Sequence, residues 1–176
     1  MSTQSEMTQC RTPEEVAQFV RTYSDELVRY AFCVVGEENA AEEVALRAMA
    51  DYVYRSRTKT LSRAYLWRMV HSRAVDYVRR HRREVPLDAV PDMAADASPE
   101  QDALREERAR ILYRCLRRLP PDYGRALYLH HLSGLSMEDV ARVMGRSVKQ
   151  VYNLLARGKA ALKQRLLEEG IDNEDL

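Results

Sequence analysis

Cysteine and long apolar runs are scarce in this sequence of 176 residues, and their scarcity excludes several classes of protein. The three cysteines, Cys10, Cys33 and Cys115, are widely spaced and odd in number, so they indicate neither a disulfide framework nor a zinc site. No apolar run approaches the roughly 18 residues of a membrane span, and the N-terminus lacks the basic start and apolar stretch of a secretory signal. We therefore expect a cytoplasmic protein that is not inserted into a membrane.

Signals for catalysis and for a bound group are missing as well. The sequence has no glycine-rich phosphate loop, and His71, His81, His130 and His131 have no cysteine or serine partner at an interpretable spacing. The composition, 45% hydrophobic and 31% charged, is typical of a globular chain with one ordinary domain or two small ones. The sequence thus predicts a globular protein with no enzymatic activity, no metal and no cofactor.

A formal net charge of +1 hides a strong segregation of charge along the chain. Seven arginines stand against one acid between residues 63 and 83, and basic character returns between residues 142 and 165. Eight acids stand against one arginine between residues 84 and 107. A single basic block would more often be a solvated helix face than a binding surface. Two blocks separated by an acidic stretch indicate two contacts with one polyanion.

Apolar residues recur at helical spacing along nearly the whole chain, which predicts an all-α fold. A first helix is expected to begin at Thr12, with a capping box to Glu15, and to end at Gly36. A second begins near Asn39, and a third follows a polar loop over residues 55–60. One face of this third helix would pack, while the other would present Arg68, Ser72, Arg79 and Arg83.

Prolines and acids between residues 85 and 98 show no apolar periodicity, which predicts a flexible acidic linker. We therefore expect two small helical domains, residues 1–84 and 99–176. In the second domain, a helix from Ser98-Pro99 would stop at Pro120-Pro121. A further helix would run from about Asp122 to His131.

Residues 136–162 have the pattern of a helix-turn-helix. A small residue at Ala141, a turn glycine at Gly145 and apolar anchors at Val151 and Leu154 follow one another at the expected intervals. Ser147 would cap the second helix, whose exposed side would carry Lys149, Tyr152, Asn153, Arg157 and Lys159. Asn153 and Lys149 suit hydrogen bonds to base edges, whereas Arg157 and Lys159 suit phosphate. An ordinary helical hairpin is the alternative.

Motifs on either side of the predicted linker carry a family resemblance. Residues 65–71 with residues 74–80 form one motif, and Leu119-Pro120, residues 134–141 and Gly145 form the other. Residues 41–44 resemble the Ala-Glu-Asp-Leu segment of a polymerase-binding helix. From about Thr12 to Leu167, the chain resembles an extracytoplasmic-function (ECF) sigma factor that has only regions 2 and 4.

The resemblance implies a promoter-specificity subunit that binds core RNA polymerase at the β′ clamp and the β flap. The polymerase contacts would be Glu42, Glu43, Leu46 and Arg47. Region 2 would recognise the −10 element of promoter DNA, and the loop over residues 55–62 would capture a flipped base. Its DNA contacts would be Tyr65, Trp67, Arg68, Ser72, Arg79, Arg80 and Arg83. Region 4 would read the −35 element through Ser147, Lys149, Tyr152, Asn153, Arg157 and Lys159.

Several residues depart from the family pattern. Leu46 and Arg47 replace the usual glutamine and acid, Ser72 replaces an asparagine, and Arg146 stands where an apolar residue is common. Core packing is an equally good interpretation of Trp67. A helix-turn-helix regulator that acts without polymerase is the main alternative function, ahead of a helical anti-sigma or adaptor protein. An anti-sigma factor is left open as a further partner.

Overall fold

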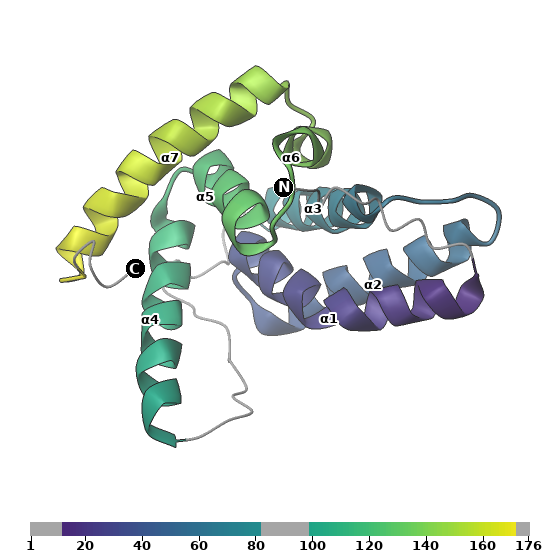
Figure 1. The fold of residues 1–176 in the computed structure, drawn as a ribbon, viewed down its shortest axis with the longest axis horizontal. Coiled ribbons are helices and arrows are strands. Elements are labelled where there is room, and N and C mark those ends of the chain that lie inside the picture. Colours follow the sequence, from purple (N-terminus) through teal and green to yellow (C-terminus); the bar gives the residue numbers. More distant parts are fainter. Residues whose placement is uncertain (1–11, 82–98, 172–176) are drawn as a thin grey trace, which may run out of the picture.

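The computed structural model describes residues 12–81 and 99–171, with the side chains of residues 99–106 left out of the description. Every regular element in these residues is helical, so the predicted all-α fold is confirmed (Figure 1). Residues 82–98, which hold Arg83 and the predicted linker, lie outside the described part of the chain. The helices are α1 (Pro13–Val35), α2 (Glu38–Ser56), α3 (Arg63–Arg80), α4 (Pro99–Arg118), α5 (Pro121–Leu127), α6 (Met137–Met144) and α7 (Val148–Glu168), with a π-helical turn over Tyr128–Leu132.

Helix α1 begins and ends where its local sequence predicts. The Thr12 hydroxyl accepts a hydrogen bond from the Glu15 backbone N–H at 3.2 Å, and the Glu15 carboxylate accepts one from the Thr12 N–H at 3.0 Å. This capping box satisfies two of the free backbone donors of the first turn. Gly36 ends the helix with a φ of 76°, in the left-handed region where other residues are strained.

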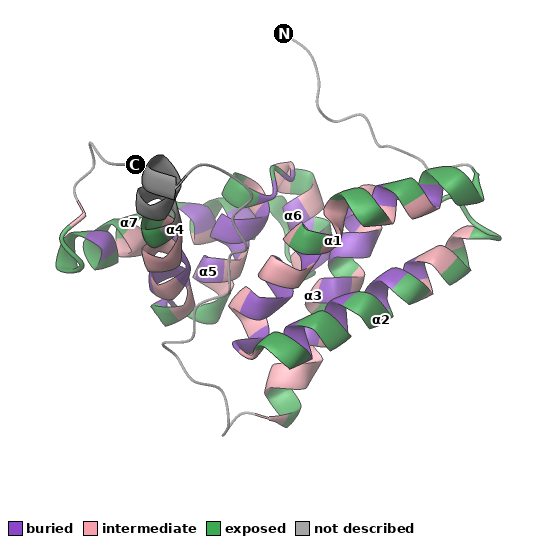
Figure 2. Ribbon diagram, turned by 90° about the horizontal axis from the view of Figure 1, so that it is seen from below, coloured by how far each residue is buried: buried purple, intermediate pink, exposed green. Residues whose placement is uncertain are grey.

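Helices α1, α2 and α3 pack together as an N-terminal helical unit. Tyr30, Tyr52, Leu66 and Trp67 are fully buried between them, and exposed residues line the outer faces (Figure 2). The Tyr52 hydroxyl donates to the Leu61 carbonyl at 3.0 Å, which holds the α2–α3 loop against the end of α2. Packing against α1 and α2 therefore fixes the rotation of α3 about its own axis.

Helices α4 to α7 form a C-terminal helical unit, and here one prediction is wrong in detail. Residues 122–131 were expected to form one helix, but α5 ends at Leu127 and continues as the wider turn over Tyr128–Leu132. The Ser133 N–H donates to the Tyr128 carbonyl at 3.0 Å, five residues back. Such a turn inserts an extra residue into the helical spacing. Leu129, in this turn, and Leu135, in the loop that follows it, are both buried.

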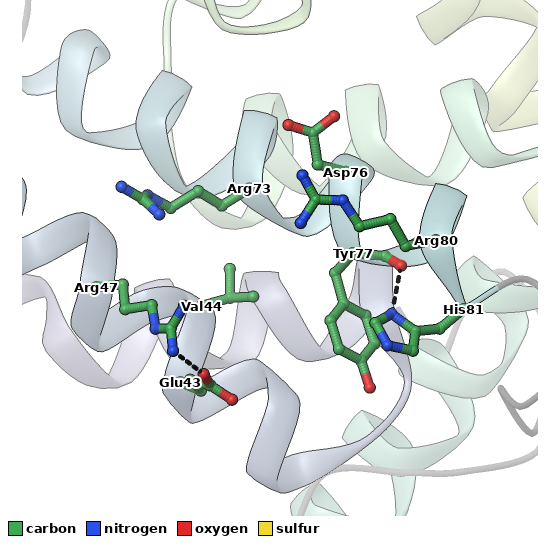
Figure 3. Close-up of a pocket in the computed structure, with 8 residues that line it drawn as sticks. All are labelled: Glu43, Val44, Arg47, Arg73, Asp76, Tyr77, Arg80 and His81. Atoms are coloured by element: carbon green, nitrogen blue, oxygen red, sulfur yellow. Dashed lines mark hydrogen bonds and ion pairs between the residues drawn. The ribbon is translucent and has the colours of Figure 1, made fainter.

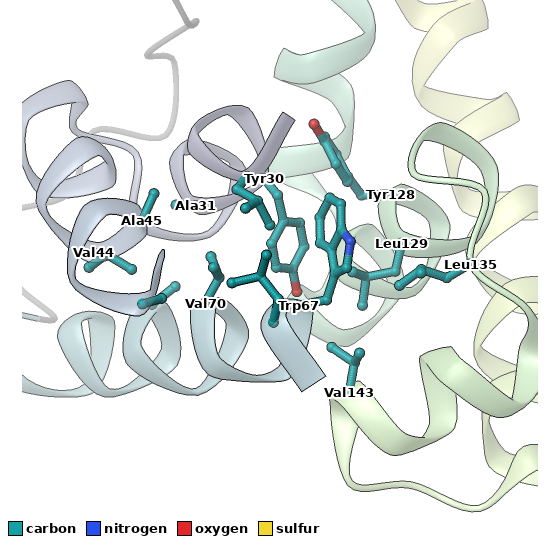
Figure 4. Close-up of a cluster of buried hydrophobic side chains, with 14 of the residues drawn as sticks. Tyr30, Ala31, Val44, Ala45, Trp67, Val70, Tyr128, Leu129, Leu135 and Val143 are labelled. Carbon is teal, nitrogen blue, oxygen red and sulfur yellow. The ribbon is translucent and has the colours of Figure 1, made fainter. Parts of the chain in front are cut away.

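The two units pack against each other, with α3 lying beside α6 (Figure 1). Their buried side chains belong to one continuous cluster that includes Tyr30 and Trp67 from the first unit and Tyr128, Leu135 and Val143 from the second (Figure 4). The rings of Tyr30 and Tyr128 are 5.2 Å apart between centroids. The chain therefore adopts a compact arrangement in which the two units share a core.

Close approach of α5 to the end of α4 generates a prediction at Gly124. A Cβ atom at this position would lie 2.5 Å from the backbone oxygen of Leu116, which cannot move without shifting α4. We expect Gly124→Ala to lower the free energy of unfolding by about 1–3 kcal/mol, measured by urea denaturation.

Gly158→Ala is the matched control. A Cβ atom there would meet the side-chain end of Leu127 at 3.1 Å, and this side chain can adjust its rotamer. We expect a smaller loss for Gly158→Ala. Equal effects of the two substitutions would show that the backbone contact at Gly124 is not the cause.

Candidate nucleic-acid interface

The predicted polymerase contacts all lie on the exposed side of α2. Glu42, Glu43, Leu46 and Arg47 are exposed, with 60% of Leu46 accessible to solvent. Arg47, one of the departures from the family pattern, forms an ion pair with Glu43 at 2.5 Å one turn earlier. This ion pair lowers the net negative charge of the exposed face. Leu46 then supplies its apolar side chain and Glu42 its unneutralised acid.

A groove connects this face of α2 with the C-terminal half of α3 (Figure 3). Arg73, Asp76 and Arg80 come from α3, and Glu43 and Arg47 line the opposite side. Arg73 is paired with Asp51 of α2, which fastens the two helices together. His81 Nδ1 donates to the Tyr77 carbonyl at 3.0 Å and its ring stacks on Tyr77, so the end of α3 is closed by its own side chains.

The exposed face of α3 carries most of the residues predicted to contact DNA. Arg68, Ser72, Arg79 and Arg80 are exposed, while Leu66, Val70 and Ala74 are buried. Arg79 forms an ion pair with Asp76 at 3.0 Å but remains largely accessible. The face of α3 that was expected to present arginine therefore does so within the described residues.

Trp67 corrects the predicted site. Its side chain is 0% exposed and lies edge-on to Tyr30, with ring centroids 5.5 Å apart (Figure 4). A base cannot stack on a ring enclosed by protein on all sides, so the prediction that Trp67 contacts DNA is wrong for this structure. The core-packing interpretation of this residue is the correct one.

The loop between α2 and α3 borders a hollow with aromatic and cationic walls. The walls include Tyr54, Arg55, Lys59, Leu61 and Tyr65, around a volume of about 430 Å³. Arg55 Nη1 donates to the Tyr65 hydroxyl at 3.0 Å, which holds the Tyr65 ring at the edge of the hollow. Aromatic faces beside positive charge suit an unstacked base and its phosphate.

Tyr54 is a member of this hollow that sequence reasoning missed. It is 71% exposed at the end of α2, and the Arg57 guanidinium lies 5.9 Å from its ring centroid. The available signal was its spacing, because Leu46 and Tyr54 are eight residues apart on one helix and share a face.

The predicted helix-turn-helix is present as α6, the turn at Gly145 and α7. Gly145 has a φ of 64°, and Ser147 and Gln150 form a reciprocal capping box at the start of α7. Val140, Ala141 and Val151 are buried between the helices. The helix-turn-helix is therefore built from the turn and cap signals that identified it in the sequence.

The exposed side of α7 brings the predicted base-reading residues together. Every predicted contact on this helix or its cap is exposed: Ser147, Lys149, Tyr152, Asn153, Arg157 and Lys159. Tyr152 is 68% exposed. Val148, which sequence reasoning missed, adds an exposed apolar side chain at the first helical position, where it suits contact with a thymine methyl group.

Arg146 departs from the family pattern but is bound by its surroundings. Its guanidinium forms an ion pair with Asp122 of α5 at 2.8 Å. Asp122 also pairs with Arg125 at 3.6 Å. The turn before α7 is thus tied to α5 by charge where an apolar contact is common in the family.

His71, His81 and His130 each form a hydrogen bond within the chain, whereas His131 is exposed. The Tyr30 hydroxyl and His71 Nδ1 are 2.6 Å apart, and burial lowers the pKa of His71 to about 4, which keeps the ring neutral near pH 7. His130 Nδ1 donates to the Leu135 carbonyl at 2.8 Å. Residues 12–81 and 99–171 contain no group of three potential metal ligands. No helix in the part of the chain that the structure describes is long and apolar enough to span a membrane.

The sequence of this chain is similar to those of a known protein family. Residues 109–162 match the protein family described as Sigma-70, region 4. The RNA polymerase sigma-E factor of Streptomyces avermitilis is 32% identical over 90% of this chain and 88% of its own length. The ECF RNA polymerase sigma factor SigM of Bacillus subtilis is 23% identical over 90% of this chain and 99% of its own.

The fold is similar to that of a solved sigma factor. The structure of RpoE in complex with the anti-sigma factor NepR from Bartonella quintana matches with a TM-score of 0.70. The match has 18% identity and covers 87% of this chain and 97% of that one. The helical arrangement is thus shared although few residues are.

These findings define a DNA-binding regulator of transcription. The chain belongs to the ECF RNA polymerase sigma factors and directs transcription initiation, as its motifs predicted.

The capping box at the start of α7 generates a prediction about the stability of the first turn of this helix. Ser147→Ala removes the acceptor for the Gln150 N–H, now 3.2 Å from the hydroxyl, and we expect a loss of about 1 kcal/mol in helix stability. Amide hydrogen exchange at residues 148–151 should accelerate. Ser147→Asp keeps an acceptor and should preserve protection. Unchanged exchange in the alanine variant would refute the role of the cap.

Proposed function

We propose that the two exposed basic surfaces, on α3 and on α7, contact the −10 and −35 elements of a promoter while α2 binds core RNA polymerase. The protein would act in the cytoplasm, where it supplies sequence recognition and no catalysis of its own. The observation that carries this proposal is the coexistence of both surfaces on one chain of the sigma family. Residues 1–84 and 99–176 would correspond to regions 2 and 4.

At the −10 element, the physical requirement is to hold separated strands. Arg68, Arg79 and Arg80 would neutralise backbone phosphates along α3, and Ser72 would face the same strand. The hollow beside Tyr54 and Tyr65 would receive an unstacked base. Base capture offsets part of the cost of opening the duplex, because the base regains a stacking partner.

At the −35 element, the N-terminal half of α7 would enter the major groove. Lys149, Tyr152 and Asn153 would face base edges, and Arg157 and Lys159 would contact phosphates further along the helix. Ser147 would support this reading as the cap of α7. Base contacts determine which sequence is bound, and phosphate contacts determine where the helix lies.

Polymerase binding would use the exposed face of α2, with Glu42, Glu43, Leu46 and Arg47 against the β′ clamp. The C-terminal unit would contact the β flap. The Bartonella relative is solved with an anti-sigma factor, and a protein of that kind is a further proposed partner of this chain.

Transcription with purified core polymerase tests the function directly. Promoters selected by the reconstituted holoenzyme should yield transcripts that depend on both elements. Tight, sequence-specific duplex binding by the protein alone, with no transcription on addition of core polymerase, would instead identify a regulator that acts without polymerase.

The α2 face generates a prediction about partnership. Replacing Glu42 and Glu43 with lysine reverses its charge and removes the partner of Arg47, so copurification with core polymerase should fall at least tenfold. Helical content measured by circular dichroism should stay unchanged, because both side chains are exposed.

Glu14→Lys with Asp25→Lys is the control, since it makes the same change in net charge on exposed positions of α1. This variant should retain polymerase binding. If both double variants copurify as well as the wild type, the α2 assignment is wrong.

The exposed side of α7 generates a prediction about sequence preference. Loss of a bidentate base contact costs about 1–3 kcal/mol of discrimination, so the Asn153→Ala holoenzyme should select a relaxed −35 sequence. Arg157→Ala should weaken binding to all sequences alike and flatten the salt dependence by about one unit. A shifted preference in Arg157→Ala, with none in Asn153→Ala or Lys149→Ala, would place the reading face on the other side of α7.

A further inference from the structure

The exposed side of α7 carries two parallel rows of side chains that differ in chemistry. Residues four apart on a helix lie above one another, so Val148, Tyr152 and Ala156 form one row. Lys149 and Asn153 belong to a second row beside it, and all five residues are exposed. Hydrogen bonds to base edges account for the second row. They leave the first, which we define as the apolar row, without a matching chemistry on the partner.

The apolar row is more exposed than folding alone favours. Val148 is 42% exposed and Tyr152 is 68% exposed, and they are the two exposed large apolar side chains in the first half of α7. Valine is also a poorer helix former than alanine, because its branched Cβ atom loses rotamer freedom in a helix. A single exposed apolar residue needs no explanation, but neighbouring ones on one helix face indicate an apolar contact with a partner.

The charge of α7 identifies the kind of partner. Between Val148 and Leu167 the helix has five basic residues and no acid. Lys149 is adjacent to Val148, and Lys159 lies two turns beyond Tyr152 on the same face. An apolar row among cations fits a polyanion that also displays apolar groups. Duplex DNA has this combination in the major groove, where the C5 methyl group of thymine lies among hydrogen-bonding base edges.

The start of α7 is held firmly enough to place Val148 accurately. The Ser147 N–H donates to the Gln150 side chain at 2.8 Å, and the Gln150 N–H donates to the Ser147 hydroxyl at 3.2 Å. Val151, on the opposite face of the same turn, is fully buried. Valine has few χ1 rotamers, so little side-chain entropy is lost when its methyl groups are held against a ligand.

The spacing of the apolar row suits stacked bases. Val148 and Tyr152 are four residues apart, which is about 6 Å along the helix axis. Successive bases of one DNA strand are about 3.4 Å apart along the duplex. A helix that lies along the major groove would therefore bring the two side chains to bases about two steps apart.

We propose that the apolar row of α7 recognises thymine methyl groups in the −35 element, with Val148 as a residue that determines specificity for thymine. This inference rests on the proposed −35 contact of α7 and adds the chemistry of the recognised base. Lys149 and Asn153 contact hydrogen-bonding groups, whereas Val148 contributes burial of apolar surface. Loss of one buried methyl group from such a contact lowers affinity about fourfold.

The test removes the methyl group first from the DNA. Promoter DNA is selected with the reconstituted wild-type holoenzyme, and each thymine of the selected −35 element, on both strands, is replaced by deoxyuridine. Deoxyuridine lacks only the C5 methyl group. We expect replacement at one or two positions to weaken holoenzyme binding about fourfold, measured by filter binding at a fixed salt concentration.

Val148→Ala removes the protein side of the same contact. It should weaken binding to the thymine promoter about fourfold and abolish the deoxyuridine effect at one position. The salt dependence of binding should stay unchanged, because no charge is lost. Thermal unfolding should show no loss of stability, since alanine is the better helix former.

Leu167→Ala is the matched control, because Leu167 is 44% exposed near the other end of the same helix. This variant should bind the thymine promoter as the wild type does and keep the deoxyuridine effect at every sensitive position. A loss of the effect in Val148→Ala alone supports the proposal.

Three outcomes would overturn the proposal. They are a selected −35 element without thymine on either strand, wild-type binding that deoxyuridine changes at no position, and a deoxyuridine effect that persists at every position in Val148→Ala. In each case promoter-dependent transcription can continue, so the proposed function would stand. Failure of the holoenzyme to transcribe from any selected promoter would overturn the proposed function and this inference together.

Discussion

The edge-on contact between Tyr30 and Trp67 is the constraint on which the rest of the molecule depends. Both side chains are fully buried, with centroids 5.5 Å apart, and the Tyr30 hydroxyl is bonded to His71 one turn beyond Trp67. These contacts fix the rotation of α3 about its axis. Because α3 cannot turn, Arg68, Ser72 and Arg79 are held toward solvent. Tyr128 packs on the same tyrosine, so one aromatic group organises both the N-terminal unit and its contact with the C-terminal unit.

The sequence predicted features that local chemistry determines. The ends of α1 and the cap of α7 depend on residues within three positions of each other, and both were located correctly. The family resemblance assigned Trp67 to DNA, although helical spacing places it beside Ala74, which is buried. Its burial is completed by Tyr30, which is distant in sequence. The π-helical turn at residues 128–132 was missed because apolar spacing over five residues does not distinguish it from a regular helical turn.

Two arginines show how unusual residues are accommodated within the sigma fold. Arg47 pairs with Glu43 and Arg146 pairs with Asp122, so each has an acid nearby. Exposed pairs of this kind contribute little to stability, about 0–1 kcal/mol, and their effect is mainly on the charge of the surface. On α2 the pair leaves a less acidic face for a partner. Near α7 it replaces an apolar anchor with one that weakens as salt increases.

Helix α7 separates two demands along its length. The middle of α7 packs closely on α5. A Cβ atom added at Gly158 would lie 3.1 Å from a Leu127 side-chain atom and 3.3 Å from the Tyr123 Cβ atom. In its first two turns only one face is exposed, with Lys149, Tyr152 and Asn153 toward solvent and Val151 buried on the other face. Substitutions of these exposed side chains would change the surface that α7 presents while leaving its packing on α5 intact. If the proposed −35 contact is right, recognition and folding can therefore be altered independently along one helix.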